Sequence, residues 1–480
     1  MVVSWNELQP GMICAPAADT PAAQWILRRS HSAGAYFVRR CSMITDFLHL
    51  KAPGNWINDP NGFLYFHGAY HLFYQHFPYA PRWGTMHWGH AVSHDLVHWT
   101  HLGIALFPSK AYDRNGVFSG SALELDGKLH LYYSAVRYLA EEPEDIHVAP
   151  AGQFVTSQVM ITSEDGKTFD NWSKQQIIPV LSDPALGDAA NTRDPKVWAS
   201  NGSYYMILGS TARDQGKVLF YRSGDGTHWN YANSYTDPSF GSMLECPDLF
   251  SLGSSYLLVG SPMGVIQDGL PYADQTMYAP ADFAEDTCTL RLLAPFTYLD
   301  WGLDLYAPQS TLDDQGRRVL IGWMRMPQAV RGEADGRGPW RGMMSLPRVV
   351  EWENGHVFFR PHPQVTAQFT QPVSSPRPTV PLRIQAVLQE GQSLGLFGYR
   401  ISRENGTVTA DRSQVLDGLS GYRLTASTPP ISAPRCPLEI YVEPNLVEIF
   451  VNHGQYVISH VVYGLRGSCS GPIDDMTTVS

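Results

Sequence analysis

The stretch Trp56-Ile57-Asn58-Asp59-Pro60-Asn61-Gly62 leads into an apolar run, a turn glycine at Gly68, and a second apolar run over residues 70–74. Two β-rich runs on either side of a turn glycine predict a β-hairpin. Asp59 lies nine residues before this glycine. The stretch therefore predicts a hairpin that carries an acid near the start of its first strand.

The same hairpin pattern recurs along the chain. Its turn glycines are Gly68, Gly127, Gly202, Gly253 and Gly316. Asp194 and Glu245 each lie eight residues before the third and fourth of these glycines, and Ser119 and Pro308 occupy the corresponding place in the other two copies. A repeated β-unit is typical of a radial fold that gathers one side chain from each repeat around an axis. We predict a five-bladed β-propeller over roughly residues 45–360, with a β-sandwich of chance internal similarity as the alternative.

A second repeated motif follows the hairpins. Residues 93–99 (Ser-His-Asp-Leu-Val-His-Trp) match residues 223–229 (Ser-Gly-Asp-Gly-Thr-His-Trp), and residues 163–169 form a looser third copy. The repetition supports the prediction that successive blades share one local structure.

Composition and charge restrict the possible partners. Apolar residues make up 44% of the 480 residues and aromatic residues 12%, enough for a globular core. The formal net charge is −11, which argues against nucleic acid as a partner because phosphate binding needs a basic face. The sequence contains no run of eighteen apolar residues, so we expect no transmembrane helix and no membrane partner.

The cysteines and the N-terminal residues bear on localisation. Six scattered cysteines without C-x-x-C spacing favour free thiols in a reducing, cytoplasmic compartment. Residues 1–42 contain four arginines and no continuous apolar core, so they do not resemble a secretory signal. They belong to no repeat. We expect either a loosely attached extension, or a start site assigned too early, or an ordered strap.

The remaining sequence predicts a linker and a second domain. Residues 361–373 contain proline and glutamine and lack a clear strand pattern. Beyond them, residues 438–442 and 447–451 alternate in polarity on either side of a turn at residues 443–445, which predicts an antiparallel hairpin. We therefore divide the chain into residues 1–42, a propeller over residues 43–360, a linker over residues 361–373, and a β-sandwich over residues 374–480.

Several short motifs stand out along the chain, at residues 56–62, 73–76, 88–91, 118–121, 193–196, 245–247, 304–309, 322–324 and 447–451. They resemble the motifs of glycoside hydrolase family 32, the group of invertases, sucrose-6-phosphate hydrolases and fructanases. The resemblance covers roughly residues 48–455, with Ile57 where the family usually has Met. The resemblance implies a five-bladed propeller followed by a β-sandwich. It also implies a retaining hydrolase of terminal β-D-fructofuranosyl bonds in sucrose, sucrose 6-phosphate or short fructans.

The resemblance assigns a role to each acid. Asp59 corresponds to the nucleophile, Glu245 to the general acid/base and Asp194 to a stabiliser of the transition state. A retaining glycosidase needs one ionised carboxylate to attack and one protonated carboxyl group to release the leaving group, about 5–5.5 Å apart. We expect Asn58 and nearby backbone N–H groups to hold Asp59 ionised, and the two neighbouring acids to favour the protonated form of Glu245. Arg193 would limit the repulsion among them.

Substrate contacts follow from the same resemblance. Side chains expected to line the fructosyl subsite are Trp56, Asn58, Gln75, Trp83, Phe118, Ser119 and Arg193. Asp300 and Trp323 are expected toward the leaving group. Aromatic faces cover the apolar side of a sugar, while amides and hydroxyls bind its hydroxyl groups. Blade packing is the alternative for Trp83 and Phe118. A phosphate on the leaving group would need Arg or Lys, for which Arg82, Arg114, Arg137 and Arg331 are candidates.

A metal site is the alternative use of a histidine-rich stretch. Residues 67–101 contain eight histidines, and the spacing of His90 and His94 would suit zinc on a helix. The stretch has strand character, and alternation would separate these side chains. We therefore expect no metal and no cofactor. Cys246 could be considered as a nucleophile, but without a visible Cys–His pairing we expect it to pack beside Glu245 or to tune it.

Other functions remain open. A fructosyltransferase would use the same covalent intermediate and pass it to a sugar. An inverting arabinanase-type propeller would need a wider separation of acid and base. A catalytically inactive sugar-binding propeller is the alternative outside enzymes. The sequence indicates no oligomeric state.

Overall fold

The computed structural model describes residues 44–266, 269–332, 335–416, 418–419 and 421–479. Nearly all of these residues lie in β-strands and their connections, with one short α-helix, α1 (Pro363–Thr366), in the described part. The predicted all-β class is therefore confirmed. The N-terminal extension predicted over residues 1–42 lies outside the described residues.

Five antiparallel sheets follow one another along the chain. The first contains β2 (Asn55–Phe66), β3 (Ala69–Phe77), β4 (His87–Ser93) and β5 (His98–Leu106), with β1 (Thr45–Phe47) at its outer edge. The second contains β6 (Gly116–Leu125), β7 (Lys128–Tyr138), β8 (Phe154–Ser163) and β9 (Gln175–Ile178). The third contains β10 (Arg193–Ser200), β11 (Ser203–Ala212), β12 (Gln215–Ser223) and β13 (Asn230–Thr236).

The last two sheets carry additional short strands. The fourth contains β14 (Met243–Leu252), β15 (Ser255–Met263), β16 (Met277–Ala284), β17 (Thr289–Leu292) and β18 (Thr297–Tyr298). The fifth contains β19 (Leu305–Leu312), β20 (Arg318–Met324), β22 (Met343–Met344), β23 (Arg348–Glu353) and β24 (His356–Pro361).

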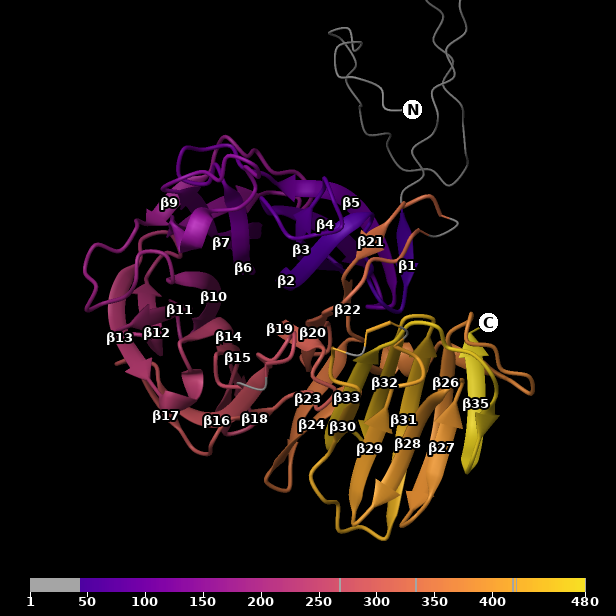
Figure 1. The fold of residues 1–480 in the computed structure, drawn as a ribbon. Coiled ribbons are helices and arrows are strands. Elements are labelled where there is room, and N and C mark those ends of the chain that lie inside the picture. Colours follow the sequence, from indigo (N-terminus) through magenta and orange to yellow (C-terminus); the bar gives the residue numbers. More distant parts are fainter. Residues whose placement is uncertain (1–43, 267–268, 333–334, 417, 420, 480) are drawn as a thin grey trace, which may run out of the picture. The chain divides into compact units, whose positions relative to one another are not determined.

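The first strands of the five sheets form a closed ring. Strands β2, β6, β10, β14 and β19 contact one another in this order, and β19 contacts β2 again (Figure 1). A short strand from the fifth repeat, β21 (Trp340–Arg341), pairs in parallel with β2 and so joins the last sheet to the first. The ring brings the start of every inner strand to the same axis.

The predicted hairpins are present in all five sheets. The turns between β2 and β3, β6 and β7, β10 and β11, β14 and β15, and β19 and β20 contain Gly68, Gly127, Gly202, Gly253 and Gly316. Each of these glycines has a φ between 65° and 79°, a left-handed conformation that costs glycine little. The glycine spacing therefore marked real turns.

The second motif is also one local structure. In each of its three copies the first serine donates a hydrogen bond to the aspartate two residues on, and that aspartate accepts from backbone N–H groups two and three residues further. The aspartates are Asp95, Asp165 and Asp225. This arrangement closes a tight turn without a backbone ladder, as short polar side chains do. It connects the third and fourth strands of the first three sheets.

Every inner strand has a β-bulge near its start. The pairing between the first and second strand of each sheet shifts by one residue, between Ile57 and Pro60, Val117 and Gly120, Arg193 and Lys196, Glu245 and Asp248, and Tyr306 and Gln309. A bulge bends the strand and redirects the side chains beside it. The five bulges therefore turn a set of side chains toward one end of the axis.

The three acids occupy different positions relative to the bulges of their strands. Glu245 is the last paired residue before its bulge, whereas Asp194 and Asp59 are the first and second unpaired residues of theirs. The expectation that the acids occupy matching positions is therefore wrong by one or two residues. Counting residues back from the turn glycine does not align the acids, because the hairpins differ in register. The pairing of β2 with β3, for example, contains a second register shift.

The C-terminal part of the chain forms two further sheets around a separate apolar core. One contains β25 (Phe369–Pro372), β26 (Leu382–Gln389), β31 (Arg435–Glu443), β32 (Leu446–Val451), β33 (Tyr456–Val461) and β35 (Ile473–Val479). The other contains β27 (Ser393–Leu396), β28 (Tyr399–Glu404), β29 (Thr407–Asp411), β30 (Thr425–Ser427) and β34 (Cys469–Ser470).

The region interpreted as a linker has regular structure. Residues 361–373 include α1 and β25, and β25 pairs with β35 in the first of the C-terminal sheets. The sequence did not show this strand because it is short and ends in Pro372, which suits the edge of a sheet. Residues 369–372 thus extend a sheet.

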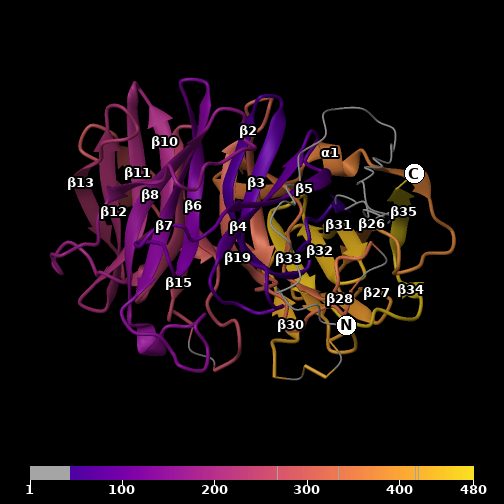
Figure 2. The ribbon, with the colours of Figure 1, turned by 90° about the horizontal axis from the view of Figure 1, so that it is seen from above.

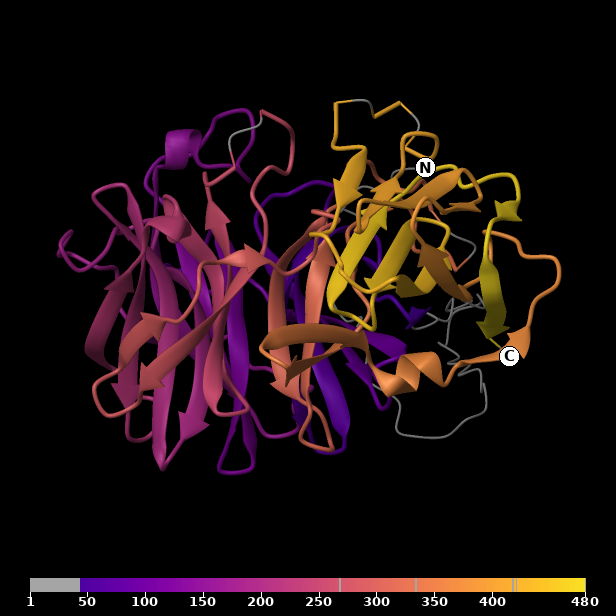
Figure 3. The same ribbon diagram turned by 90° about the horizontal axis from the view of Figure 1, so that it is seen from below.

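A buried ionic network joins the C-terminal sheets to the ring, which lie side by side in Figures 2 and 3. Arg348 of β23 donates to Glu448 of β32 at 2.7 Å and contacts Asp300 at 2.9 Å. His49, just before β2, contacts Glu448 at 2.9 Å and Glu443 at 3.1 Å. Because such groups are costly to bury unless paired, the network fixes which residues of the two parts face each other.

Two further findings concern the surface and the thiols. Among the described residues, no helix has the length and apolar character needed to cross a membrane. The four cysteines of the described chain, Cys246, Cys288, Cys436 and Cys469, carry free thiols.

The network predicts a pH-dependent stability. Burial opposes the charge on His49, but Glu443 and Glu448 outweigh it and raise the pKa of His49 from 6.5 to about 9. Because the folded pKa exceeds the unfolded value, the stabilisation is complete below pH 6.5 and is lost as the pH rises through about 9. We expect the unfolding free energy to fall over this interval by an amount on the order of 3 kcal/mol, and Tm to fall with it.

The test is thermal unfolding between pH 6 and 10 of the wild type and of His49→Gln. The variant should be less stable at pH 6 and should lack the fall in Tm above pH 6.5. Exposed His94 provides the control, and His94→Gln should keep the wild-type profile. Equal profiles for wild type and His49→Gln would contradict the prediction.

Candidate active site

Asp59 is held by two side chains at the start of the first inner strand. Ser119 Oγ donates to Asp59 Oδ2 at 2.5 Å, and Asn58 Nδ2 donates to Oδ1 at 3.1 Å. Gln75 Nε2 donates in turn to Ser119 Oγ at 2.5 Å. The carboxylate itself is half-buried, so it retains an open side. These contacts fix its orientation. Asn58 contacts Asp59 as expected and its hydrogen bond favours the ionised form, but burial outweighs this and raises the pKa of Asp59.

Glu245 lies between a guanidinium and a phenol. Arg193 Nη2 donates to Glu245 Oε1 at 2.6 Å, and Tyr306 O–H donates to Oε2 at 2.6 Å. Arg193, Glu245 and Tyr306 occupy the same position in three successive inner strands, the last paired residue before the bulge. The equivalence of these positions around the ring explains why the three side chains meet.

Asp194 and Cys246 contact each other, and the Cys246 thiol lies between Asp194 and Asp59. The backbone N–H of Cys246 donates to Asp194 Oδ2 at 3.0 Å. The Cys246 Sγ lies 3.6 Å from Asp194 Oδ2 and 3.6 Å from Asp59 Oδ2. Both residues are first in their bulges and have positive φ, 67° for Asp194 and 46° for Cys246, a strained conformation for residues with a Cβ. The bulges thus hold the acids at the cost of local strain.

Burial sets the charge state of these groups. It raises the pKa of Asp194 to about 7, with Arg193 opposing and Glu245 reinforcing the shift. It also raises the pKa of Asp59, against the hydrogen bond from Ser119. Burial and the adjacent carboxylates raise the pKa of Cys246 well above its usual value, so its thiol stays protonated. A protonated thiol that touches two carboxylates serves as a donor between them and not as a nucleophile.

Aromatic side chains pack beside the residues that hold the acids. Trp56 donates from Nε1 to Asn58 Oδ1 at 2.8 Å and packs edge-on against Trp323, with ring centroids 5.6 Å apart. Trp83 is 38% exposed and packs edge-on against Phe118 at 5.9 Å. The expected substrate contacts Trp56, Asn58, Gln75, Trp83, Phe118, Ser119, Arg193 and Trp323 are therefore linked by contacts to the acids or to one another.

Asp300 does not belong to this set. It is 2% exposed, accepts hydrogen bonds from the backbone N–H groups of Gly302 and Ser459, and pairs with Arg348 at the contact with the C-terminal sheets. Its expected place toward the leaving group is wrong. A buried carboxylate with these partners stabilises the fold, whereas the family resemblance had suggested a site residue.

Two residues of the site were not predicted from the sequence. Tyr306 contacts Glu245 directly, and its only sequence signal was its place within a matching motif. Arg341 lies in β21, with its guanidinium 5.0 Å from the ring centroid of Trp56 and Nη2 donating to Tyr272 O–H at 3.1 Å. No sequence signal pointed to Arg341, because only the ring closure brings β21 to β2.

The arginines suggested by the sequence lie elsewhere or are already paired. Arg82 pairs with Asp145 at 2.9 Å, and Arg114 pairs with Glu141. Arg137 and Arg331 are exposed on the surface. Of these four, Arg82 alone contacts an expected substrate-binding residue, through a hydrogen bond from Nη1 to the backbone oxygen of Trp83.

The histidine-rich stretch forms pairwise contacts. His71 Nδ1 lies 3.0 Å from His90 Nε2, His76 contacts the backbone oxygen of Trp56, and His101 contacts Asp46. Within the described residues, no three or more His, Cys, Asp or Glu side chains are grouped so as to hold a metal ion.

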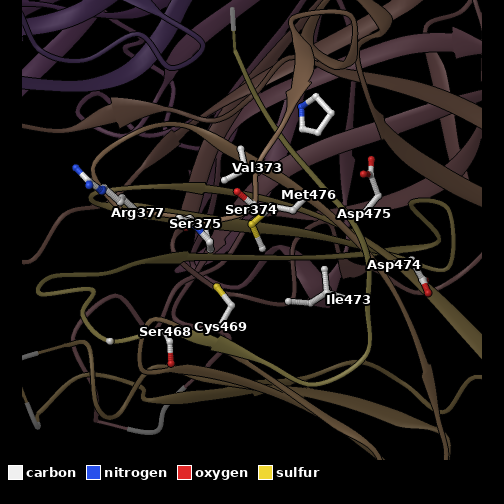
Figure 4. A pocket seen from close by; sticks show the side chains of 13 residues that line it. Val373, Ser374, Ser375, Arg377, Ser468, Cys469, Ile473, Asp474, Asp475 and Met476 are labelled. Carbon is white, nitrogen blue, oxygen red and sulfur yellow. The ribbon is translucent and has the colours of Figure 1, made fainter.

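A separate hollow lies in the C-terminal part of the chain and is lined by residues 372–377, 467–469 and 473–476 (Figure 4). None of the three acids lines it. The chemistry therefore belongs to the ring, where Asp59, Asp194 and Glu245 meet.

Carboxyl groups that converge, with tryptophan side chains packed beside them, are the equipment of a glycosidase. Residues 49–361 match the model of the glycosyl hydrolases family 32 N-terminal domain. The chain belongs to glycoside hydrolase family 32. It is therefore an enzyme of the glycoside hydrolase class, as its motifs predicted.

Relatives of known name extend this finding over most of the chain. A raffinose invertase of Escherichia coli is 34% identical, with 88% of this chain and 90% of the relative covered. A sucrose-6-phosphate hydrolase of the same species is 34% identical, with 92% and 93% covered. Among solved structures, a family 32 beta-fructofuranosidase of Bombyx mori is 27% identical, with a TM-score of 0.73 and 91% and 92% covered.

The site geometry predicts the effect of removing Ser119. Its hydroxyl stabilises the carboxylate form of Asp59, so Ser119→Ala should raise the pKa of Asp59 further, by about one pH unit for a hydrogen bond to a charged group. Carbon-13 NMR of labelled aspartate carboxyl groups would follow the titration. Ser121 is the control, because its hydroxyl bonds the backbone of Pro195, and Ser121→Ala should leave Asp59 unchanged. If Asp59 titrates identically in Ser119→Ala and wild type, the Ser119 hydroxyl does not stabilise its carboxylate form.

Proposed function

We propose that this enzyme is a retaining β-fructofuranosidase that hydrolyses a terminal β-D-fructofuranosyl bond in sucrose or a related sugar. The proposal rests on two carboxyl groups, those of Asp59 and Glu245, which have different hydrogen-bond partners. Asp59 is fixed by Ser119 and Asn58 with one open side, and Glu245 is fixed by Arg193 and Tyr306. A nucleophile and an acid/base need such different surroundings. The names of the relatives support the same reaction.

In the first step, the Asp59 carboxylate attacks the anomeric carbon of the fructosyl unit. The bond from that carbon to the bridging oxygen breaks, and the oxygen keeps the electron pair and takes the proton of Glu245. In the second step, Glu245 removes a proton from water, the water oxygen bonds the anomeric carbon, and the ester to Asp59 breaks. The two displacements together retain the anomeric configuration.

The other residues act on binding and charge. Asp194 would bond hydroxyl groups of the sugar and balance the positive charge that develops on the ring. Arg193 keeps the acids from repelling one another, since it donates to Glu245 and its Nε lies 4.0 Å from Asp194. Among the described residues, buried Gln75 Oε1 has no hydrogen-bond partner, so it is available to a sugar hydroxyl. Trp56, Trp83 and Phe118 would cover the apolar faces of the substrate.

The fold assignment belongs to the same proposal. We infer that the five sheets of the ring are the blades of a five-bladed propeller and that the C-terminal sheets form a β-sandwich. The closed order of contacts among the inner strands supports the first part. The separate core enclosed by the C-terminal sheets supports the second.

The decisive experiment is incubation with sucrose while proton NMR follows the products. We expect fructose to appear first as the β anomer, with mutarotation following. In excess sucrose, some of the intermediate should pass to sugar and give a trace of trisaccharide. Initial release of the α anomer would exclude the retaining mechanism, and absence of any fructosyl product from both sucrose and sucrose 6-phosphate would exclude the function.

Variants of the two principal acids test their roles. Asp59→Ala and Glu245→Ala should each reduce kcat to less than about a hundredth of the wild-type value, since positioned acid catalysis alone contributes roughly 10²–10⁴-fold. Both should keep a wild-type Tm within a few degrees. Asp248→Ala serves as a control for removing a buried carboxylate, because Asp248 pairs with Lys196 below the site. Residual activity above that level in either variant would refute the assigned role.

We also propose that Arg341 recognises a phosphate on the leaving group. Arg341 stacks on Trp56, which bonds Asn58 beside Asp59, and its hydrogen bonds go to the Met326 backbone and Tyr272. A partly exposed guanidinium whose hydrogen bonds go to neutral groups is suited to a phosphate. Arg341→Gln should lower kcat/KM for sucrose 6-phosphate at least tenfold more than for sucrose. Equal losses on both substrates would show that this enzyme does not use Arg341 to recognise phosphate.

A further inference from the structure

Arg325, which directly follows β20, is a buried cation close to the active site. It is 4% exposed. Its guanidinium donates to the backbone oxygens of Leu303 at 2.6 Å and Asp274 at 2.8 Å, and more weakly to Gln275 Oε1 at 3.3 Å and the backbone oxygen of Asp304 at 3.4 Å. Every one of these acceptors is a neutral oxygen. Within the described residues, no carboxylate is among them.

Neutral acceptors alone do not indicate a function. Arg403, buried in the C-terminal sheets, also donates only to backbone oxygens. What distinguishes Arg325 is the pair of rings that it contacts. Its guanidinium carbon lies 4.7 Å from the ring centroid of Tyr306 and 4.9 Å from that of Tyr272. A guanidinium on the face of a phenol is attracted by the ring and restricts its tilt.

Tyr306 connects this cation to the chemistry. Its hydroxyl donates to Glu245 Oε2 at 2.6 Å, while Arg193 occupies Oε1. The ring of Tyr306 is buried, so the direction of its hydroxyl is set by what packs on its faces. Arg325 covers one of them, and Trp323 meets the ring edge-on at 6.4 Å.

We propose that Arg325 is a positioning residue for the acid/base group: by stacking on Tyr306 it holds the phenol against Glu245 and brings a fixed positive charge near that carboxylate. This inference rests on the proposed function of Glu245. The carboxylate of Glu245 must form each time the leaving group takes its proton. A fixed donor and a nearby cation stabilise that form and cost no reorganisation during the reaction.

Other charged and titratable groups surround Glu245 and Arg325, the two residues that Tyr306 connects. Those that face Glu245 are Asp59 on β2, Arg193 and Asp194 on β10, Cys246 on β14 and Tyr306 on β19. Those that face Arg325 are Tyr272, Asp274, Asp304 and Tyr306. The carboxylate of Asp304 is bound by Arg412. Of these groups, Tyr306 is in both sets, so a change at Arg325 reaches Glu245 through it.

The test compares the pH dependence of kcat/KM on sucrose in four proteins: wild type, Arg325→Met, Arg325→Lys and Tyr306→Phe. Losing the phenol or its support weakens the carboxylate form of Glu245, so the protonated form persists to higher pH. We expect the basic limb to move upward by about one unit in Tyr306→Phe and in the same direction in Arg325→Met. Arg325→Lys keeps the charge without the planar stack and should show a smaller shift.

The matched control is Arg403→Met, which removes an equally buried, carbonyl-bound arginine away from the acids. It should lower Tm and leave the position of the basic limb unchanged. Combining Arg325→Met with Tyr306→Phe should give a shift smaller than the sum of the two single shifts, because both changes remove the same hydrogen bond from the hydroxyl of Tyr306. A basic limb in both Arg325 variants that coincides with that of wild type and Arg403→Met would overturn the proposal and leave Arg325 a structural residue.

A second readout separates this proposal from the proposed function. Carbon-13 NMR of labelled glutamate carboxyl groups, with Glu245 assigned from Glu245→Gln, reports its titration without any substrate. The titration should move to higher pH in Arg325→Met and in Arg325→Lys, whether or not sucrose is cleaved. If the wild type cleaves sucrose and this titration does not move in the folded Arg325 variants, the positioning role fails. If the titration moves but no fructose is released, the proposed function fails instead.

Discussion

The structure depends on one constraint: five inner strands must all begin close to a common axis. Each strand meets this constraint with a one-residue bulge at the same level. A bulge leaves residues without ladder partners and turns their side chains away from the sheet. In an isolated sheet such a break would weaken pairing, but in a closed ring five breaks converge. The catalytic set is therefore built from positions where regular β-structure is interrupted.

The bulges also place hydrogen-bond donors beside the three acids, which reduces the electrostatic repulsion among their carboxyl groups. Three carboxyl groups in a small buried space repel one another, and burial raises the pKa of Asp59 and Asp194. Arg193, Tyr306 and Glu245 take equivalent positions in three strands, so a guanidinium and a phenol reach the acid from either side. The thiol of Cys246 occupies the space between the other two acids. Each donor reduces a repulsion that the fold itself creates.

The C-terminal sheets take part in this arrangement through buried ion pairs. Arg348 is bound by carboxylates from both sides of the contact, and Asp304, two residues before Tyr306, is bound by Arg412. Replacing one member of such a pair leaves an uncompensated charge, which typically costs about 3–5 kcal/mol. The strand that carries Tyr306 is thus anchored in the second part of the molecule. Asp300, which the sequence suggested as a substrate contact, serves this anchoring.

The sequence by itself determined the repeated unit, the all-β class and the acids, because turn glycines and acid-containing motifs are local signals that need no tertiary context. It also contained a better guide to the bulges than glycine spacing: Pro195, Pro247 and Pro308 each occupy the second unpaired position, where a residue without an N–H loses no ladder bond. Only the tertiary structure decided which side chains meet. Tyr306, Arg325 and Arg341 reach the site through packing between strands far apart in the chain, and no local pattern records such contacts.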